Sequence, residues 1–238
     1  MKYLLEQLIS PVSPSGCEKN VAAVLAKLAA PYGEVSTDSL GNLTVYKKGT
    51  GKRILLAAHM DTVGFIVTQV DEHGFVRFGT LGGIKPVNAV GQRVRFENGV
   101  IGVVCCERGT EPKDLTADSL YIDTAGERVQ VGDAAVYDGT PYFAGSKVIS
   151  PYLDNRLGCA VCLKALELMK DTDNEIFCTF TVQEEVKIAS RNAEYTAVKH
   201  RVDIIRSALK AVKSYSALFE RSEQSAGNNS FAAVALHG

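Results

Sequence analysis

The sequence lacks an excess of either charge and lacks long apolar runs, and each absence excludes a class of partner. Its 238 residues carry 26 basic and 27 acidic side chains, a net charge of −1. Such a chain has no broad basic field to bind a phosphate backbone, so we expect no nucleic-acid partner. No apolar run has the length of a membrane span, so we expect no membrane partner.

Cysteines are also few, and they do not form the pattern of a disulfide framework. The six cysteines are at positions 17, 105, 106, 159, 162 and 178, and we expect them to be reduced. Cys159 and Cys162 form one isolated Cys-x-x-Cys pair in a predicted helix, which favours core packing over a zinc site. The opening MKYLLEQLIS resembles the first helix of a domain more than a secretory signal. We therefore expect a cytoplasmic protein.

What the sequence does contain is an alternation of helical and strand patterns at its beginning. In SGCEKNVAAVLAKLAAPYG, Ser15 precedes Glu18 by the capping-box spacing, and apolar residues then recur with helical period. NLTVYKK (42–48) and KRILLAAH (52–59) follow as two predicted strands. With 46% apolar residues to fill a core, this alternation predicts an α/β domain.

The pattern changes between residues 64 and 149. Six short β-like pieces are punctuated by glycine turns, without a helical pattern of useful length. GTLGGIKP (79–86) lacks the strand-to-helix setting of a dinucleotide loop and predicts a turn. We therefore predict a small β-barrel domain, residues 64–149, inserted into the α/β domain.

The α/β pattern resumes with a predicted helix from about Asn155 to Lys170 and a buried strand in EIFCTFTVQEE (175–185). The predicted fold is a phosphorylase/hydrolase-like α/β sheet with helices on both faces. Its domain is discontinuous, made of residues 1–63 and 150–186.

Polar side chains lie at the ends of the predicted buried strands and at the start of the predicted helix. His59 and Asp61 follow the strand 54–58, Asp154 precedes a helix, and Glu184 and Glu185 follow the strand 176–182. Each has a plain structural reading when taken alone: a histidine at a strand end, a helix cap, a solvated acidic turn. Together they offer one crevice the imidazole nitrogen and carboxylate oxygens that divalent cations prefer.

These residues lie in three short motifs, AHMDTVGF, SPYLDNRLGC and TVQEEV, in this order and with a β insertion between the first two. In this the sequence resembles the glutamyl or tetrahedral aminopeptidases, a family of dinuclear metallopeptidases some of which carry the older name endoglucanase M. The resemblance covers residues 1–186. It implies two divalent metal ions, zinc or cobalt, short peptide substrates and a homo-oligomer.

The resemblance also implies roles for individual residues. His59 would bind one metal and Asp61 would orient it, Asp154 would bridge both metals, Glu184 would be the general base, and Glu185 would be a ligand. This suits the chemistry, because two cations held by one carboxylate can share a water, lower its pKa and polarise a peptide carbonyl. It predicts that His59, Asp154 and Glu185 lie within a few ångströms of one another.

The last 52 residues differ from the rest. Residues 187–238 hold 8 Lys and Arg against 4 Asp and Glu, whereas residues 1–186 hold 18 against 23. This basic tail has helical spacing over 202–219 but does not resemble the family, whose C-terminal part is missing. The family's second Asp ligand and final His have no counterpart, since Asp203 and His237 match by residue type alone.

With three ligands for two metals, we expect this chain to be weakly active or inactive, although the family function is that of an aminopeptidase. A second hypothesis is a catalytically silent assembly or binding subunit, with the β insertion and the basic tail as interfaces. A third uses the paired carboxylates on sugars, but a glycosidase needs two separated carboxylates and no metal, which the spacing of His59 and Asp61 does not favour.

Overall fold

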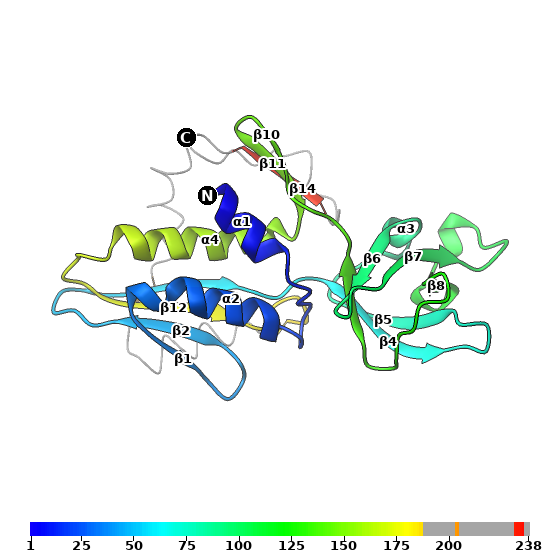
Figure 1. Ribbon diagram of the computed structural model, residues 1–238, viewed down its shortest axis with the longest axis horizontal. Coiled ribbons are helices and arrows are strands. Elements are labelled where there is room, and N and C mark those ends of the chain that lie inside the picture. The colour runs from blue at the N-terminus through cyan, green and yellow to red at the C-terminus, as the bar shows by residue number, and fades with distance from the viewer. Residues whose placement is uncertain (188–202, 205–230, 236–238) are drawn as a thin grey trace.

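The computed structural model describes residues 1–187 in full and, further along, the backbone of residues 203–204 and 231–235 (Figure 1). The helices are α1 (Lys2–Ile9), α2 (Lys19–Ala29), α3 (Pro86–Ala89) and α4 (Leu153–Leu168). Short 3₁₀ turns occur at Ala30–Tyr32, Pro112–Asp114 and Ala117–Ser119. No helix of this described part is long and apolar enough to cross a bilayer.

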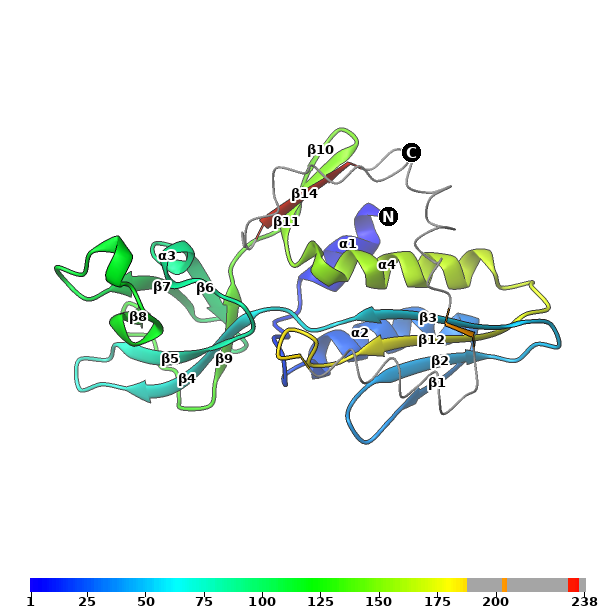
Figure 2. The same cartoon turned by 180° about the vertical axis from the view of Figure 1, so that it is seen from behind.

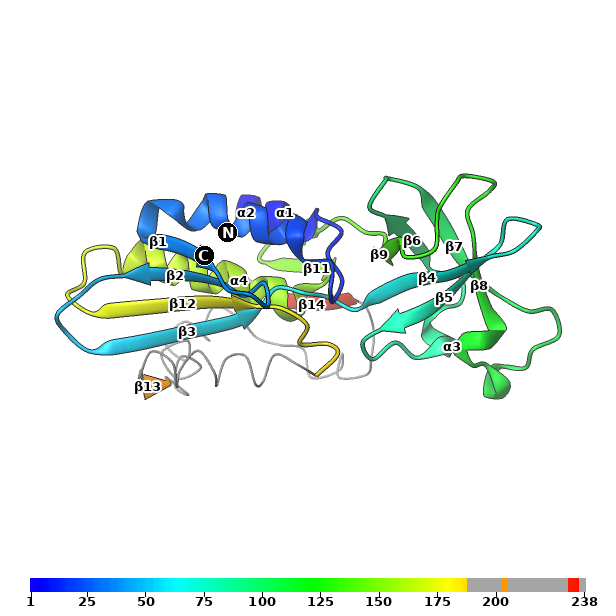
Figure 3. The same ribbon diagram turned by 90° about the horizontal axis from the view of Figure 1, so that it is seen from below.

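The central sheet has five strands in the order β1-β2-β12-β3-β13. They are β1 (Glu34–Thr37), β2 (Leu43–Lys47), β3 (Arg53–His59), β12 (Glu175–Thr181) and β13 (Asp203–Ile204). β12 runs parallel to β3 and lies between β3 and β2, so the two strands adjacent in sequence are not neighbours in the sheet. Thr181 pairs with His59, and β3 and β12 therefore end at the same edge (Figure 3).

The core lies between this sheet and the helices α1, α2 and α4, which share one apolar cluster with one sheet face. Alternate residues of β12, Ile176, Cys178 and Phe180, point into that cluster and are fully buried, as the two-residue period of a strand requires. Tyr46 and Phe177 form a second cluster with Leu55. The described helices cover one face, and the helix predicted for the other face is not among the described residues.

The inserted segment forms a closed barrel with the strand order β4-β5-β8-β7-β6-β9 (Figures 1 and 2). Its strands are β4 (Gly64–Val70), β5 (Val76–Leu81), β6 (Arg93–Phe96), β7 (Ile101–Cys106), β8 (Leu120–Asp123) and β9 (Ala134–Tyr137). Each corresponds to one of the six β-like pieces in the sequence. The predicted α/β fold with an inserted barrel is confirmed.

The strands after the barrel form a separate small sheet. β10 (Tyr142–Ala144) and β11 (Lys147–Pro151) pair with each other, and β11 pairs with β14 (Phe231–Ala235). The barrel therefore ends at Tyr137, and the rest of the predicted 64–149 insertion lies outside it. The division of the chain into independently folding domains stays a prediction.

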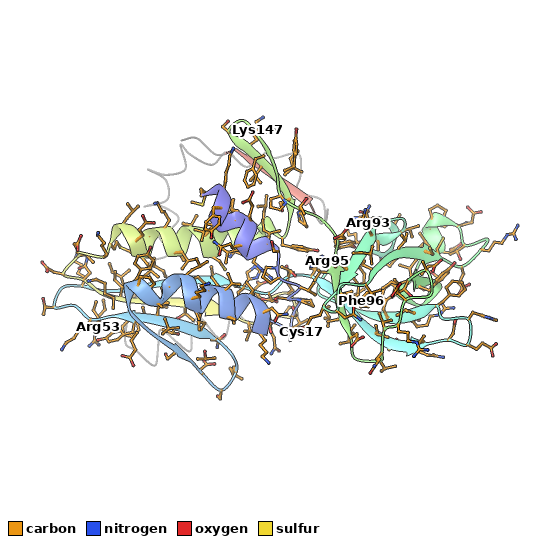
Figure 4. The ribbon with its side chains drawn as sticks, viewed as in Figure 1. Cys17, Arg53, Arg93, Arg95, Phe96 and Lys147 are labelled. Carbon is orange, nitrogen blue, oxygen red and sulfur yellow. The ribbon has the colours of Figure 1, made fainter. Side chains whose placement is uncertain are left out.

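A few contacts join the barrel to the α/β part. Arg95 donates a hydrogen bond to the Ser10 carbonyl at 3.0 Å, and Asn20 donates one to Glu97 Oε1 at 2.9 Å. Figure 4 shows Arg95 and Phe96 on the side of the barrel nearest α1, with Cys17 close by beside α2. Pro14 also forms an isolated parallel bridge with Thr62.

The helical pattern predicted over 202–219 is wrong at its start, because Asp203 and Ile204 form β13 beside Ile54 and Leu55. Pairing along β3 favours the extended backbone there. The remainder of that prediction lies outside the described residues.

Candidate metal centre

Three chain segments bring the predicted site residues to one edge of the sheet. His59 is the last residue of β3, Glu184 and Glu185 lie just beyond the end of β12, and Asp154 lies at the start of α4. Asp154 and Asn155 have non-helical backbone angles, and the peptide bond between them is cis. Regular helix therefore begins after Asn155, and Asp154 faces the strand ends from an extended segment.

The side chains meet around the His59 imidazole. Its Nε2 lies 3.2 Å from Asp154 Oδ1 and 3.9 Å from Glu184 Oε2. One ligand atom each from His59, Glu184 and Glu185 lies within 4.8 Å of the other two. The imidazole is 10% exposed, whereas the Asp154 side chain is 77% exposed. The cluster is thus closed behind the ring and open to solvent in front of it.

Asp61 lies behind the ring and is completely buried. Its Oδ1 is 3.3 Å from His59 Nδ1. Its carboxylate also accepts hydrogen bonds from the Ser15 hydroxyl at 2.6 Å and from the backbone N–H groups of Glu184 and Glu185 at 3.0 and 3.1 Å. With its oxygens so engaged, Asp61 can fix the ring and leave Nε2 facing the solvent side.

The cluster places one imidazole among several carboxylates. Burial lowers the pKa of His59, but hydrogen bonds to Asp154 and Asp61 outweigh it and raise that pKa to about 10. Burial raises the pKa of Glu185 to about 7. Asp154 and Asp61 thus favour the protonated imidazole, whereas burial, with the neighbouring carboxylates adding to it, disfavours ionisation of Glu185.

This donor set fits a divalent metal ion. The imidazole of His59 and the carboxylate oxygens of Glu184 and Glu185 lie within 4.8 Å of one another, and such atoms are the ligands that zinc and similar ions take. Such an ion would offset the crowded negative charge in place of the imidazolium proton. Among the described residues, His59, Glu184 and Glu185 form the cluster that could hold it, and Asp154 adds an oxygen 3.2 Å from His59 Nε2.

The capping box predicted for Ser15 and Glu18 is wrong. α2 begins at Lys19 without a side-chain cap, and the Ser15 hydroxyl donates to Asp61 instead. Glu18 Oε1 accepts from the backbone N–H groups of Gly16 and Gln183. The same residue types that cap a helix can accept or donate elsewhere, and here Ser15 and Glu18 bond to Asp61 and to the Gln183 backbone instead of to the helix.

Sequence reasoning also missed Gly82, in the stretch it assigned to a turn. Gly82 has a φ of +87°, and a Cβ at this position would lie 3.0 Å from Glu185 Cβ and 2.9 Å from Val63 Cγ1. A glycine-rich stretch indicates that another part of the protein lies close to its backbone, but the sequence does not identify that part. The loop after β5 therefore brings the barrel against the Glu184–Glu185 turn.

All six cysteines are free, as predicted. Cys159 and Cys162 are buried in the core, where this pair was predicted to pack. The Cys159 thiol contacts the His59 carbonyl at 3.3 Å, so α4 also supports the end of β3.

Comparison with known proteins places these observations in a family. The family model described as M42 glutamyl aminopeptidase matches residues 41–207. A putative aminopeptidase from Acetivibrio thermocellus is 42% identical over 210 residues, which are 84% of this chain and 63% of that protein. The chain thus spans less than two thirds of this relative's length.

Solved structures agree with the fold. The TET aminopeptidase from the marine sediment archaeon Thaumarchaeota archaeon SCGC AB-539-E09 is 31% identical, with a TM-score of 0.75 over 83% of this chain and 63% of that one. The Pyrococcus horikoshii TET1 peptidase, which can assemble into a tetrahedron or a large octahedral shell, is 26% identical, with a TM-score of 0.70 over 79% and 62%. By sequence and by fold, this chain belongs to the M42 glutamyl aminopeptidase family.

Proposed function

We propose that this chain carries the metal centre of an aminopeptidase that removes N-terminal residues from short peptides with two divalent ions, zinc or cobalt. The observation that carries the proposal is the position of His59 Nε2, 3.2 Å from Asp154 Oδ1 and 3.9 Å from Glu184 Oε2. Asp61 supports the ring from behind. Membership of an aminopeptidase family supplies the reaction class.

Each residue of the cluster would have a separate role in hydrolysis. His59, Asp154 and Glu185 would hold the ions, with Asp154 as the bridge, and the bound pair would lower the pKa of a shared water and polarise the peptide carbonyl. Glu184, whose side chain is 46% exposed, would take a proton from the attacking water and pass it to the leaving amine. Asp61 would keep His59 Nδ1 protonated and the ring in place.

The ligand set of this chain is short for two ions. Each ion would have about two protein ligands if Asp154 is counted for both, whereas a catalytic zinc normally has three and a water. Asp203 does not supply another, because its backbone pairs with Ile54, five residues and therefore about 16 Å along β3 from His59. His237 lies outside the described residues. We therefore propose weak or no turnover for these 238 residues.

Two further properties belong to the proposal. A homo-oligomer is supported by the assemblies of the Pyrococcus horikoshii TET1 peptidase. A cytoplasmic location is supported by six free cysteines, since reduced thiols are the rule in that compartment.

The test pairs metal content with hydrolysis of aminoacyl-p-nitroanilides by the full chain. We expect at least one weakly held or empty site, and slow hydrolysis that a chelator abolishes. Glu184→Gln should reduce any hydrolysis about 100-fold or more, because it removes the general base. Glu167→Gln on α4 is a matched control, since its side chain is 48% exposed and pairs with nearby Lys164 at 2.9 Å.

Three results would contradict this proposal in different ways. Hydrolysis that survives chelation would remove the metal dependence. Two tightly held ions with fast turnover would show that ligands beyond His59, Asp154 and Glu185 exist. A folded chain with neither metal nor hydrolysis would support the alternative of a silent assembly subunit.

A further inference from the structure

The turn that carries Glu184 and Glu185 is held in place by buried side chains. The backbone N–H groups of residues 182–185 donate in order to four side-chain oxygens: Asn42 Oδ1 at 3.1 Å, Glu18 Oε1 at 3.0 Å, Asp61 Oδ1 at 3.0 Å and Asp61 Oδ2 at 3.1 Å. These acceptors come from three separate chain segments. Figure 2 shows the blue segment before α2 beside the yellow turn after β12.

These acceptors are shielded from water and fixed by further contacts. Glu18 is 7% exposed, Asn42 1% and Asp61 0%, so water cannot readily replace them. Ser15, also buried, donates its hydroxyl to Asp61 Oδ2 at 2.6 Å, and Glu18 Oε1 also accepts from the Gly16 N–H at 2.9 Å. Because an unpaired buried polar group is costly, each acceptor favours the turn geometry that keeps it paired.

The turn needs such support. Gln183, which immediately precedes the proposed general base, has a φ of +59°, a left-handed conformation that few non-glycine residues adopt. Hydrogen bonds from N–H groups to carboxylates are stronger than those to neutral acceptors. Those made by Glu18 and Asp61 can therefore hold a backbone that the local sequence does not favour.

We propose that Ser15, Glu18 and Asn42 are positioning residues which, with Asp61, form a cradle that fixes the Glu184–Glu185 turn opposite His59. This amide cradle acts through the main chain of the turn, so it determines where both glutamate side chains begin. The inference rests on the proposed role of these glutamates in the metal centre. It assigns a positioning role to two further segments, the one before α2 with Ser15 and Glu18 and the loop before β2 with Asn42. Neither segment is proposed to contact the metal ions or the substrate.

The test measures amide hydrogen exchange of the turn and Co²⁺ affinity in the same full-length variants. Glu18→Ala should speed exchange at the Gln183 amide about tenfold or more, since one hydrogen bond to a charged acceptor is lost. Co²⁺ affinity should fall about 10- to 100-fold, the usual effect of losing a partner that orients ligands. Glu18→Gln should restore most of both, because its amide oxygen can still accept.

Asn42→Ala and Ser15→Ala provide independent tests if Glu18→Ala does not fold. Asn42→Ala should expose the Val182 amide, and Ser15→Ala should loosen the amides of Glu184 and Glu185 through Asp61. Ile176→Val is the control, because it lowers packing at the other end of β12 without touching the turn. It should leave exchange at 182–185 and Co²⁺ affinity unchanged.

The outcomes separate this inference from the proposed function. Folded Glu18→Ala and Asn42→Ala chains with protected turn amides would overturn the cradle. Loss of protection with unchanged Co²⁺ affinity would overturn its positioning role. A wild-type chain that takes up no Co²⁺ would overturn the proposed function, and the exchange rates would still decide whether the cradle holds the turn.

Discussion

At the level of single residues, Asp61 connects the two halves of the candidate site. This buried carboxylate contacts the imidazole on one side and two backbone N–H groups of the glutamate turn on the other. Burial alone would raise the pKa of Asp61, but hydrogen bonds from His59, Ser15 and the turn amides hold it below its ordinary value. The folded chain therefore binds this proton less tightly than the unfolded chain does.

This shift predicts how stability depends on pH. Because the folded pKa is lowered, Asp61 contributes stability above its unfolded value, near pH 4, and that contribution is lost as pH falls through the folded value. Asp61→Asn should remove this acid-side loss and lower stability at pH 7 by about 1–3 kcal/mol, since an amide cannot accept all the hydrogen bonds that the carboxylate accepts. Urea unfolding between pH 3 and pH 7 measures both effects.

A matched control for this variant is Asp71→Asn in the barrel. Asp71 also accepts two backbone N–H groups, those of His73 and Phe75, both at 2.9 Å. Asp71→Asn should leave Co²⁺ affinity unchanged, whereas Asp61→Asn should lower it about 10- to 100-fold. Equal Co²⁺ affinities in the two variants would contradict the orienting role of Asp61.

At the scale of elements, periodicity predicted the strands well. The six barrel strands, β3 and β12 all lie where alternating or continuous apolar residues mark them, because burial follows the two-residue period directly. The strand order could not be predicted, since nothing local in β2 or β3 indicates that β12 inserts between them. β10 and β11 were missed as a separate sheet because β11 has a distant partner, β14.

The sequence indicated the members of the candidate site that are polar residues at the end of a strand or the start of a helix. His59, Asp154 and the two glutamates stand out as a set, because at strand ends and a helix start they together offer the ligands that a divalent cation prefers. Ser15 and Glu18 were assigned to a helix cap because a cap uses the same donors and acceptors over short sequence separation. Their partners Asp61 and Gln183 are brought near only by the tertiary fold.

At the scale of the whole molecule, the barrel is both an insertion and a neighbour of the site. Its first and last strands pair with each other, with Phe65 opposite Ala135, so the chain enters and leaves the barrel at nearly the same place. Such an arrangement favours a separable domain. Yet Gly82, in the loop after β5, packs against Glu185, which links the barrel to the proposed metal centre.

Removing residues 64–137 and joining the ends with a short glycine linker tests this. We expect the remaining chain to fold and to bind Co²⁺ more weakly, because the Glu185 turn loses its contact with Gly82. Gly82→Ala in the full chain should weaken Co²⁺ binding in the same direction, since a Cβ meets Glu185 and φ is positive there. A deletion that unfolds the α/β part would contradict the predicted domain division.

The central claim is that His59, Asp154 and Glu185 bind a divalent metal ion at the edge of the sheet. Anomalous diffraction at the zinc absorption edge, from crystals of the full chain soaked in zinc, tests it most directly. We expect a peak about 2 Å from His59 Nε2, in contact with the carboxylates of Asp154 and Glu185. Crystals that hold zinc on other residues, while this edge of the sheet shows no peak, would contradict it.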